Sequence, residues 1–332
     1  MRHLLKLIVL VLCSTLIVDT AILSKAMAID IKTSDKLRIA TFNVSMEALN
    51  YVEHSSNSAP KITGNELTQA LQKNTQQIKN IAEIIQRVNP DIILLNEFDR
   101  IDNNHSNIRY FVNNYLAQGQ NGQASIDYPY FYQGPVNTGM KINSDLNNDG
   151  ITNQQPGDTH GFGYFEGHYG MVLLSKYPIK EKEIRTFQHF KWRDMPNALK
   201  PIDPSTNKPW FTNKVWQELR LSSKSHWDIP INIDGKIVHI LASHPTPPVF
   251  DGPEDRNGKR NHDEIRFWFD YINGDKEDYI YDDLGNKGGL PPKQPFVILG
   301  DQNASIINGN AIANKGSQGI YALLNSEKIQ DP

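Results

Sequence analysis

The sequence is almost without cysteine, because its 332 residues contain a single one, Cys13. A chain with one cysteine forms no internal disulfide, so a disulfide-stapled scaffold is excluded. A zinc site is also disfavoured, since the chain has neither a cysteine pair nor a closely spaced histidine pair. Stability must therefore come from the burial of apolar residues, a class that makes up 39% of the chain, and from any metal that the protein binds.

Neither sign of charge is in large excess. The chain has 34 Lys and Arg against 37 Asp and Glu, which gives a net charge of −3. No run of Lys or Arg forms a basic track, which argues against a dedicated high-affinity DNA-binding protein. Phosphate chemistry is not excluded, because a bound cation can supply the positive charge.

The chain also has no uninterrupted hydrophobic run that is long enough to span a membrane comfortably. Its first 28 residues have a basic start, an apolar stretch broken by Asp19, and the small-x-small sequence Ala26-Met27-Ala28. This pattern is typical of a secretory signal peptide, and an uncleaved anchor is the weaker alternative. We therefore expect residues 29–332 to be a secreted or periplasmic domain without stable membrane insertion. Cys13 would be lost with the signal peptide.

Strand and helix patterns alternate irregularly along the rest of the chain. Apolar residues recur at helical spacing up to residue 88, and Asn89-Pro90 predicts the end of that helix. Asp234-Gly235 predicts the turn of a hairpin. The segments are strands at 37–44, 91–95, 171–174 and 296–299, a hairpin over 231–241, helices at 66–88, 262–272 and 320–324, and a long loop at 134–167. Because strict β-α-β alternation is missing, an α/β (α+β) fold with mixed sheets is favoured over a doubly wound parallel sheet.

Polar side chains stand where four apolar strands end. They are Asn43, Glu97, His244 and the pair Asp301 and Asn303. Strand ends that meet at one edge of a sheet would bring these groups together. Their hard oxygen ligands suit Mg²⁺ or Mn²⁺, which keep several waters and hold a substrate phosphate. Taken singly, each residue has an ordinary structural explanation, such as a turn, a cap or a loop histidine.

The same motifs, in this order, resemble the endonuclease/exonuclease/phosphatase superfamily. Each motif alone is a weak signal, whereas the ordered set is specific. The resemblance covers residues 37 to about 303 and is carried by Leu37–Val44, Pro90–Glu97, Gly170–Ile179, His239–His244 and Phe296–Asn303. It implies a four-layered α/β/β/α sandwich of two mixed sheets flanked by helices.

The resemblance also implies a role for each strand-end residue. Glu97 would hold the metal, with help from Asn43. Asp301 would orient or deprotonate the attacking water, and Asn303 would contact the phosphate. His244 would stabilise the charge of the transition state or assist the leaving group.

The sequence departs from the family pattern at three places. Asn96 stands where the family usually has Gln, and Ser45 stands where apurinic-type endonucleases have Asp. The family ends on a Ser-Asp-His segment, and no such segment follows Asn303. We therefore expect the domain over 29–332 to be C-terminally incomplete and to lack the last strands of one sheet.

Two further segments are candidates for ligand binding. Arg256, Arg260 and His262 could contact phosphate, although a solvated loop before a helix explains them equally well. Lys224 and His226 are weaker candidates of the same kind.

The second segment is a candidate Ca²⁺ loop. Its ligands would be Asp145, Asn147, Asp149 and Asn153, with Gly150 at the turn, and Asp158 could supply a late ligand. Pro156 replaces the usual final Glu, so an Asx-rich flexible loop is the alternative.

The sequence thus predicts a secreted hydrolase that cleaves phosphate esters by metal-assisted in-line attack of water. Its substrate would be a nucleic acid, a phospholipid head group or a small phosphate ester, and no protein partner is evident. The alternatives are a non-catalytic fragment or pseudoenzyme of the same fold and a surface module that binds phosphate esters or glycans without turnover.

Overall fold

A computed structural model describes residues 36–52, 61–274, 278–307 and 315–331. The helices and strands described here belong to one compact unit, Arg38–Pro332. The predicted signal peptide over residues 1–28, with Cys13, lies outside the described residues. Among the described helices, none combines the length and the apolar composition that crossing a bilayer requires.

The first sheet is mixed. Its strands, in spatial order, are β1 (Ile39–Met46), β2 (Ile92–Phe98), β4 (Met171–Ser175) and β3 (Tyr130–Tyr132). β1 runs parallel to β2, and β4 runs antiparallel to both of its neighbours. β4 is buried along its whole length, and β2 is buried at every position but one, which explains why β2 up to Leu95 and β4 up to Leu174 are continuous apolar runs in the sequence.

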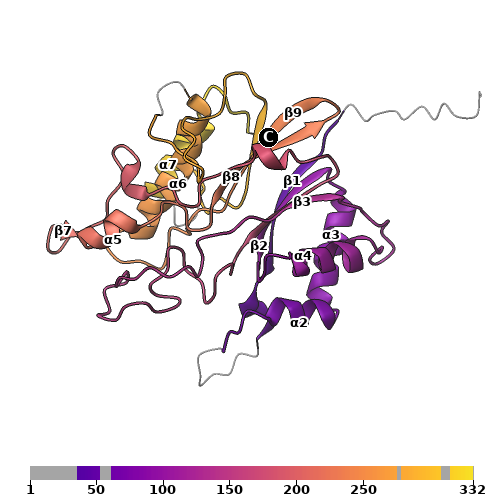
Figure 1. Ribbon diagram of the computed structural model, residues 1–332, viewed down its shortest axis with the longest axis horizontal. Coiled ribbons are helices and arrows are strands. Elements are labelled where there is room, and N and C mark those ends of the chain that lie inside the picture. Colours follow the sequence, from indigo (N-terminus) through magenta and orange to yellow (C-terminus); the bar gives the residue numbers. More distant parts are fainter. Residues whose placement is uncertain (1–35, 53–60, 275–277, 308–314, 332) are drawn as a thin grey trace, which may run out of the picture. The chain divides into compact units, whose positions relative to one another are not determined.

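Helices cover one face of this sheet (Figure 1). They are α2 (Glu66–Gln72), α3 (Gln76–Val88), α4 (Ser106–Phe111) and the π-helical turn η2 (Val112–Leu116), with the short helix η1 (Ala48–Tyr51) beside them. The single helix predicted over 66–88 is interrupted, because Asn74 adopts a φ of 58° between α2 and α3. The predicted end at Asn89 is confirmed by its left-handed φ of 48°.

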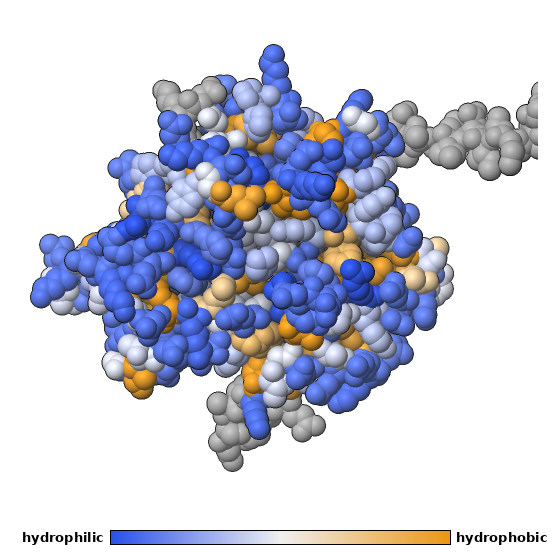
Figure 2. Space-filling model, in the orientation of Figure 1, coloured by the Kyte–Doolittle hydropathy of each residue, from blue (hydrophilic) through white to orange (hydrophobic). Residues whose placement is uncertain are grey.

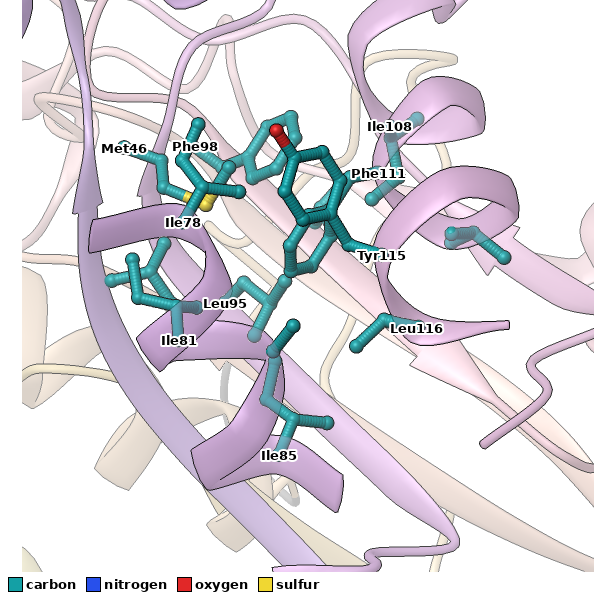
Figure 3. Packing of buried hydrophobic residues seen from close by; sticks show 14 of the residues in the cluster. Met46, Ile78, Ile81, Ile85, Leu95, Phe98, Ile108, Phe111, Tyr115 and Leu116 are labelled. Atoms are coloured by element: carbon teal, nitrogen blue, oxygen red, sulfur yellow. The ribbon is translucent and has the colours of Figure 1, made fainter. Parts of the chain in front are cut away.

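The core between these helices and the sheet is apolar. Ile78, Ile81 and Ile85 of α3 lie on one helical face, as their spacing predicts, and pack toward Leu95 and Phe98 of β2 (Figure 3). Burying a side chain of this size contributes roughly 1.5–3 kcal/mol.

The second sheet is also mixed. Its strands, in order, are β10 (Phe296–Leu299), β9 (Lys236–Ser243), β8 (His226–Ile233) and β5 (Arg185–Thr186). The predicted hairpin joins β8 to β9 through Asp234 and Gly235, whose φ values of 50° and 89° suit a tight two-residue turn. β10 runs parallel to β9.

A second apolar core lies between this sheet and its helices. The helices are α5 (Asn213–Glu218), α6 (Arg256–Asn273) and α7 (Lys315–Leu324), and the short elements nearby are η3 (Glu181–Glu183), η4 (Trp192–Asp194), β6 (Ile202–Asp203) and β7 (Lys208–Pro209). The helix predicted over 262–272 begins earlier, at Arg256, so the polar residues before Asn261 form its first turns.

The two sheets face each other, with the helices outside. Tyr132 of β3 meets Trp227 of β8 edge to face, with ring centroids 5.0 Å apart. Asn96 of β2 donates from Nδ2 to the carbonyl of Ser243 on β9 at 3.5 Å. The protein therefore has the predicted four-layered α/β/β/α arrangement.

The segment 134–167 is a long loop, as predicted, and within it Thr138 pairs with Gly161 and Lys141 pairs with Thr159. On the face seen in Figure 2 the surface is largely hydrophilic, with hydrophobic residues in separate small patches, which is ordinary for a globular surface.

Candidate active site

Strand pairing brings the four predicted strand ends to a common place. In the first sheet, Asn43 of β1 lies opposite Asn96 of β2 in parallel register, and Glu97 follows directly. In the second sheet, Leu299 of β10 lies opposite Ala242 of β9 in parallel register. His244 and Asp301 each follow these two residues by two positions. Each sheet therefore delivers two polar groups at the carboxyl ends of neighbouring parallel strands.

The polar groups from the two sheets are in contact. Asn43 donates from Nδ2 to Asp301 Oδ2 at 3.1 Å. His244 Nε2 lies 3.9 Å from Glu97 Oε1 and 3.9 Å from Asp301 Oδ2. We call Asn43, Glu97, His244 and Asp301 the strand-end cluster. Asn303 lies beside it, because its backbone N–H donates to Asp301 Oδ1 at 3.0 Å.

The members of the strand-end cluster differ in burial. His244 is only 2% exposed, whereas the side chains of Glu97 and Asp301 are 22% and 36% exposed. Burial, with a smaller contribution from the charge of Lys224, holds the pKa of His244 well below its usual range. The imidazole is therefore neutral near pH 7, and its Nδ1 makes no hydrogen bond within the described residues.

The backbone around the cluster is unusual. Ser45, Glu97 and Asn303 have φ values of 46°, 58° and 51°. Non-glycine residues with positive φ are uncommon, and strained conformations tend to gather at functional sites. Gly300 has a φ of 139°, and a Cβ atom there would lie 1.8 Å from the carbonyl oxygen of Ser243. Only glycine therefore lets β10 approach β9 closely enough to place Asp301.

Asn96 joins the two sheets behind the cluster. It is fully buried, its Oδ1 accepts from the backbone N–H of Asp301 at 3.2 Å, and its Nδ2 donates to Ser243. The departure from the family's usual Gln at this position is thus accommodated by a side chain that positions Asp301. Sequence patterns alone gave no sign of this role.

Glu264 of α6 supports the loops on the other side of the cluster. It is 1% exposed, and its two carboxylate oxygens accept the backbone N–H groups of Ser223 and Thr246, both at 2.6 Å. The Ser223 hydroxyl donates to the carbonyl of His244 at 3.4 Å. Sequence analysis missed Glu264, because a buried carboxylate on a helix carries no signal until its partners are known.

Lys224 and His226, two weaker candidates, differ in their surroundings. His226 is held by Ser222 at Nδ1 and by the carbonyl of Glu264 at 2.8 Å from Nε2, and burial lowers its pKa to about 4. Lys224 is 6% exposed, and burial lowers its pKa, while Glu264 and the carboxylates of the strand-end cluster act in the opposite direction. His226 is therefore engaged in the fold, whereas Lys224 lies within electrostatic reach of the cluster.

The three predicted phosphate ligands on α6 have other partners. Arg260 is buried and donates to the carbonyls of Leu221, Arg220 and His160. Arg256 pairs with Glu254, and His262 Nδ1 lies 2.9 Å from Asp263 Oδ1. These contacts do not favour phosphate binding by the three residues, which stays a prediction.

The candidate Ca²⁺ loop is closed by its own hydrogen bonds. Asp145 accepts from the backbone N–H of Asp149 at 3.2 Å and of Gly150 at 2.9 Å. Asn147 donates from Nδ2 to Asp149 Oδ2 at 3.0 Å. Asn153 has a φ of 65° and makes no recorded contact with these three side chains. Calcium binding here stays a prediction.

The donor set of the strand-end cluster fits a magnesium-type ion. Among the described residues, no group of three or more His, Cys, Asp and Glu side chains has the arrangement of an all-protein metal site. Mg²⁺ does not need one, since it is usually held by one or two carboxylates, waters and the substrate phosphate. Glu97 suits such an ion, because within the described residues its carboxylate has only long contacts, with Ser45 Oγ at 3.5 Å and His244 Nε2 at 3.9 Å.

Comparison with known proteins gives a family and a set of similar folds. The model of the endonuclease/exonuclease/phosphatase family matches residues 40–312. No curated protein matches significantly.

Similar solved structures include an endonuclease/exonuclease/phosphatase from Beutenbergia cavernae, with 14% identity and a TM-score of 0.41 over 86% of this chain and 52% of that one. A beta toxin variant from Staphylococcus aureus with bound magnesium ions has 16% identity and a TM-score of 0.40 over 89% and 71%. Sphingomyelinase C from Streptomyces griseocarneus has 14% identity and a TM-score of 0.38 over 86% and 70%. The chain thus spans about half the length of the first of these.

Proposed function

The chain belongs to the endonuclease/exonuclease/phosphatase family, and from this premise we propose that it hydrolyses phosphate esters with the help of Mg²⁺ or Mn²⁺. The observation that carries the proposal is the strand-end cluster, in which His244 Nε2 lies 3.9 Å from both Glu97 and Asp301. Two carboxylates, an amide and a neutral histidine at one place are the groups that attack of water on a phosphate requires.

Each residue of the proposed site has one task. Glu97 and Asn43 would hold the cation, which supplies charge neutralisation for the phosphate oxygens when it is bound. Asp301 would accept a proton from the attacking water or orient it. Its position is fixed by the hydrogen bonds from Asn43 and from the backbone N–H of Asn303.

His244 would act on the developing charge or on the leaving group. Its low pKa makes it neutral near pH 7, so it donates a hydrogen bond from one ring nitrogen only. Asn303 would contact the phosphate. In the structure its Nδ2 donates to the carbonyl of Pro245 at 3.1 Å, so the side chain would contact phosphate through its second amide hydrogen or after rotation.

The residues of the proposed site account for recognition of the phosphate ester and of no other part of the substrate. A nucleic acid, a phospholipid head group and a small phosphate ester all present the group that the proposed site needs. The predicted signal peptide would place the activity in the periplasm or outside the cell.

A substrate panel tests the proposal. The purified protein is incubated with bis-p-nitrophenyl phosphate, p-nitrophenyl phosphate, single-stranded DNA and sphingomyelin micelles, with Mg²⁺, with Mn²⁺ and with EDTA. We expect turnover of at least one substrate that EDTA abolishes and that falls by about 10²- to 10⁴-fold in His244→Ala. Binding of phosphate esters without turnover of any substrate would instead favour the non-catalytic alternative.

A further inference from the structure

The loop before β8 places the positively charged side chain of Lys224 near the strand-end cluster. Ser223 is tied to Glu264 through its backbone N–H at 2.6 Å and to the carbonyl of His244 through its hydroxyl at 3.4 Å. The next residue, Lys224, therefore starts from a backbone position that is fixed next to His244. Its own carbonyl accepts the backbone N–H of Asn137 at 2.8 Å, which holds the loop from the other side.

The side chain of Lys224 is mostly buried, and its ammonium group has no bonded partner in the part of the chain that the structure describes. The residue is 6% exposed, and among the described residues no acceptor lies within hydrogen-bonding or ion-pair distance of Nζ. Glu264, its strongest electrostatic neighbour, already uses both carboxylate oxygens on backbone N–H groups. Nζ is not one of the fully buried side-chain atoms that lack a partner, so it keeps a small contact with solvent through which a ligand could reach it. A charge in so buried a position gains more from a bonded partner than an exposed charge does.

The other nearby cation is not available for this purpose. Arg260 is a positive charge near enough to Lys224 to lower its pKa. Its guanidinium donates to three backbone carbonyls and so holds the loops around residues 160 and 220. Lys224, in contrast, lies within electrostatic reach of Glu97 and Asp301, the two carboxylates of the strand-end cluster.

We propose that the ammonium group of Lys224 binds a non-bridging oxygen of the phosphate that is hydrolysed at the strand-end cluster. The proposal rests on the proposed function. A lysine ammonium is a compact point charge that suits phosphate oxygens. It would supply positive charge from the side of the second sheet, whereas Glu97 and Asn43 would hold the cation from the first. Its three donors also suit the oxygens of a phosphate whose charge grows in the transition state.

A purely structural role for Lys224 is the alternative. In that role the lysine balances the charges of Glu97, Glu264 and Asp301 and never contacts substrate. The two roles differ in one measurable property. A phosphate-binding lysine changes the affinity for inorganic phosphate by the full effect of a charge-assisted hydrogen bond and also changes the kinetic constants. A charge-balancing lysine changes mainly the stability of the fold and affects phosphate only through the weaker, screened interaction at a distance.

The test compares Lys224→Met with Lys236→Met, which alters an exposed lysine at the tip of the β8–β9 hairpin. Inorganic phosphate is titrated into each folded protein by calorimetry in the presence of Mg²⁺. We expect Lys224→Met to bind phosphate about 10- to 100-fold more weakly, the effect of losing one charge-assisted hydrogen bond. On a substrate identified with the panel, kcat/KM should fall by about 10²- to 10³-fold. The control should match the wild type in both measurements.

Unchanged phosphate affinity in folded Lys224→Met would overturn the proposal, even if turnover of the wild type supports the proposed function. Absence of turnover in the wild type would instead count against the proposed function, and the phosphate titration would still decide the role of Lys224.

A second measurement needs no variant, in case Lys224→Met and Lys224→Gln both fail to fold. In the wild type labelled with ¹³C at the lysine Cε atoms, one lysine signal should shift when phosphate is added in the presence of Mg²⁺. No change in any lysine signal at saturating phosphate would overturn the proposal.

Discussion

Replacing Glu97 with glutamine separates metal binding from folding. Glu97→Gln keeps the shape of the side chain and removes its charge. The contacts that would be affected are weak, with Ser45 Oγ at 3.5 Å and His244 Nε2 at 3.9 Å, and the side chain is 22% exposed. We therefore expect the free energy of unfolding in EDTA to change by no more than about 0.5 kcal/mol.

The effect on metal affinity should be much larger. A bound Mg²⁺ lies about 2.0–2.1 Å from a ligand oxygen and carries two charges, so two unit charges about 4 Å apart give a conservative measure of its interaction with Glu97. Two unit charges about 4 Å apart interact by about 1 kcal/mol in bulk water and by about 4 kcal/mol near a protein surface. Because Glu97 is partly exposed, the interaction energy that is lost with its charge should lie between these two limits. Such a loss corresponds to roughly 5- to 1,000-fold weaker binding of a cation.

The assay is calorimetric titration with Mn²⁺, followed by turnover as a function of Mg²⁺ concentration. The matched control is Glu83→Gln on α3, since Glu83 pairs with Arg87 of the same helix at 2.7 Å and has no recorded contact with the cluster. Metal affinity and turnover of Glu97→Gln that equal those of the control would refute the assignment of Glu97. A large loss of stability in EDTA would refute the reasoning about its contacts.

Three further predictions concern the fold and the loops. Gly300→Ala should destabilise the protein by more than about 3 kcal/mol and reduce activity, because its Cβ would lie 1.8 Å from the Ser243 carbonyl oxygen; an unchanged urea midpoint would contradict this. Burial lowers the pKa of His226 to about 4 and that of His160 to about 3. Because the unfolded state then binds more protons below pH 6.5, stability should be full above that pH and fall by about 1.4 kcal/mol per pH unit for each histidine toward pH 4; urea midpoints that stay level from pH 7 to 5 would disprove the effect. Millimolar Ca²⁺ should raise the melting temperature, by linkage, in the wild type and not in Asp149→Ala; no shift in the wild type would rule out the loop as a site.

The elements of the fold and the candidate site residues could be read from local patterns. Apolar runs predicted β2 and β4, and the Asp234-Gly235 pair predicted a hairpin. Both signals are local, because the spacing of apolar side chains and the conformation of a turn depend on a few neighbouring residues. The break between α2 and α3 at Asn74 was not predicted from the sequence. A change of backbone direction inside a helical pattern depends on what the two halves pack against.

The sequence by itself determined which residues stand at the strand ends, because Asn43, Glu97, His244 and Asp301 each follow an apolar run. Only the tertiary structure decided which other charges join them. Arg260 donates to backbone carbonyls, whereas Lys224 is mostly buried near the cluster and has no bonded partner among the described residues. Such a difference cannot be read from sequence. The free energy of a buried charge depends on the acceptors that distant segments bring within about 3 Å of it, and local patterns do not specify those segments.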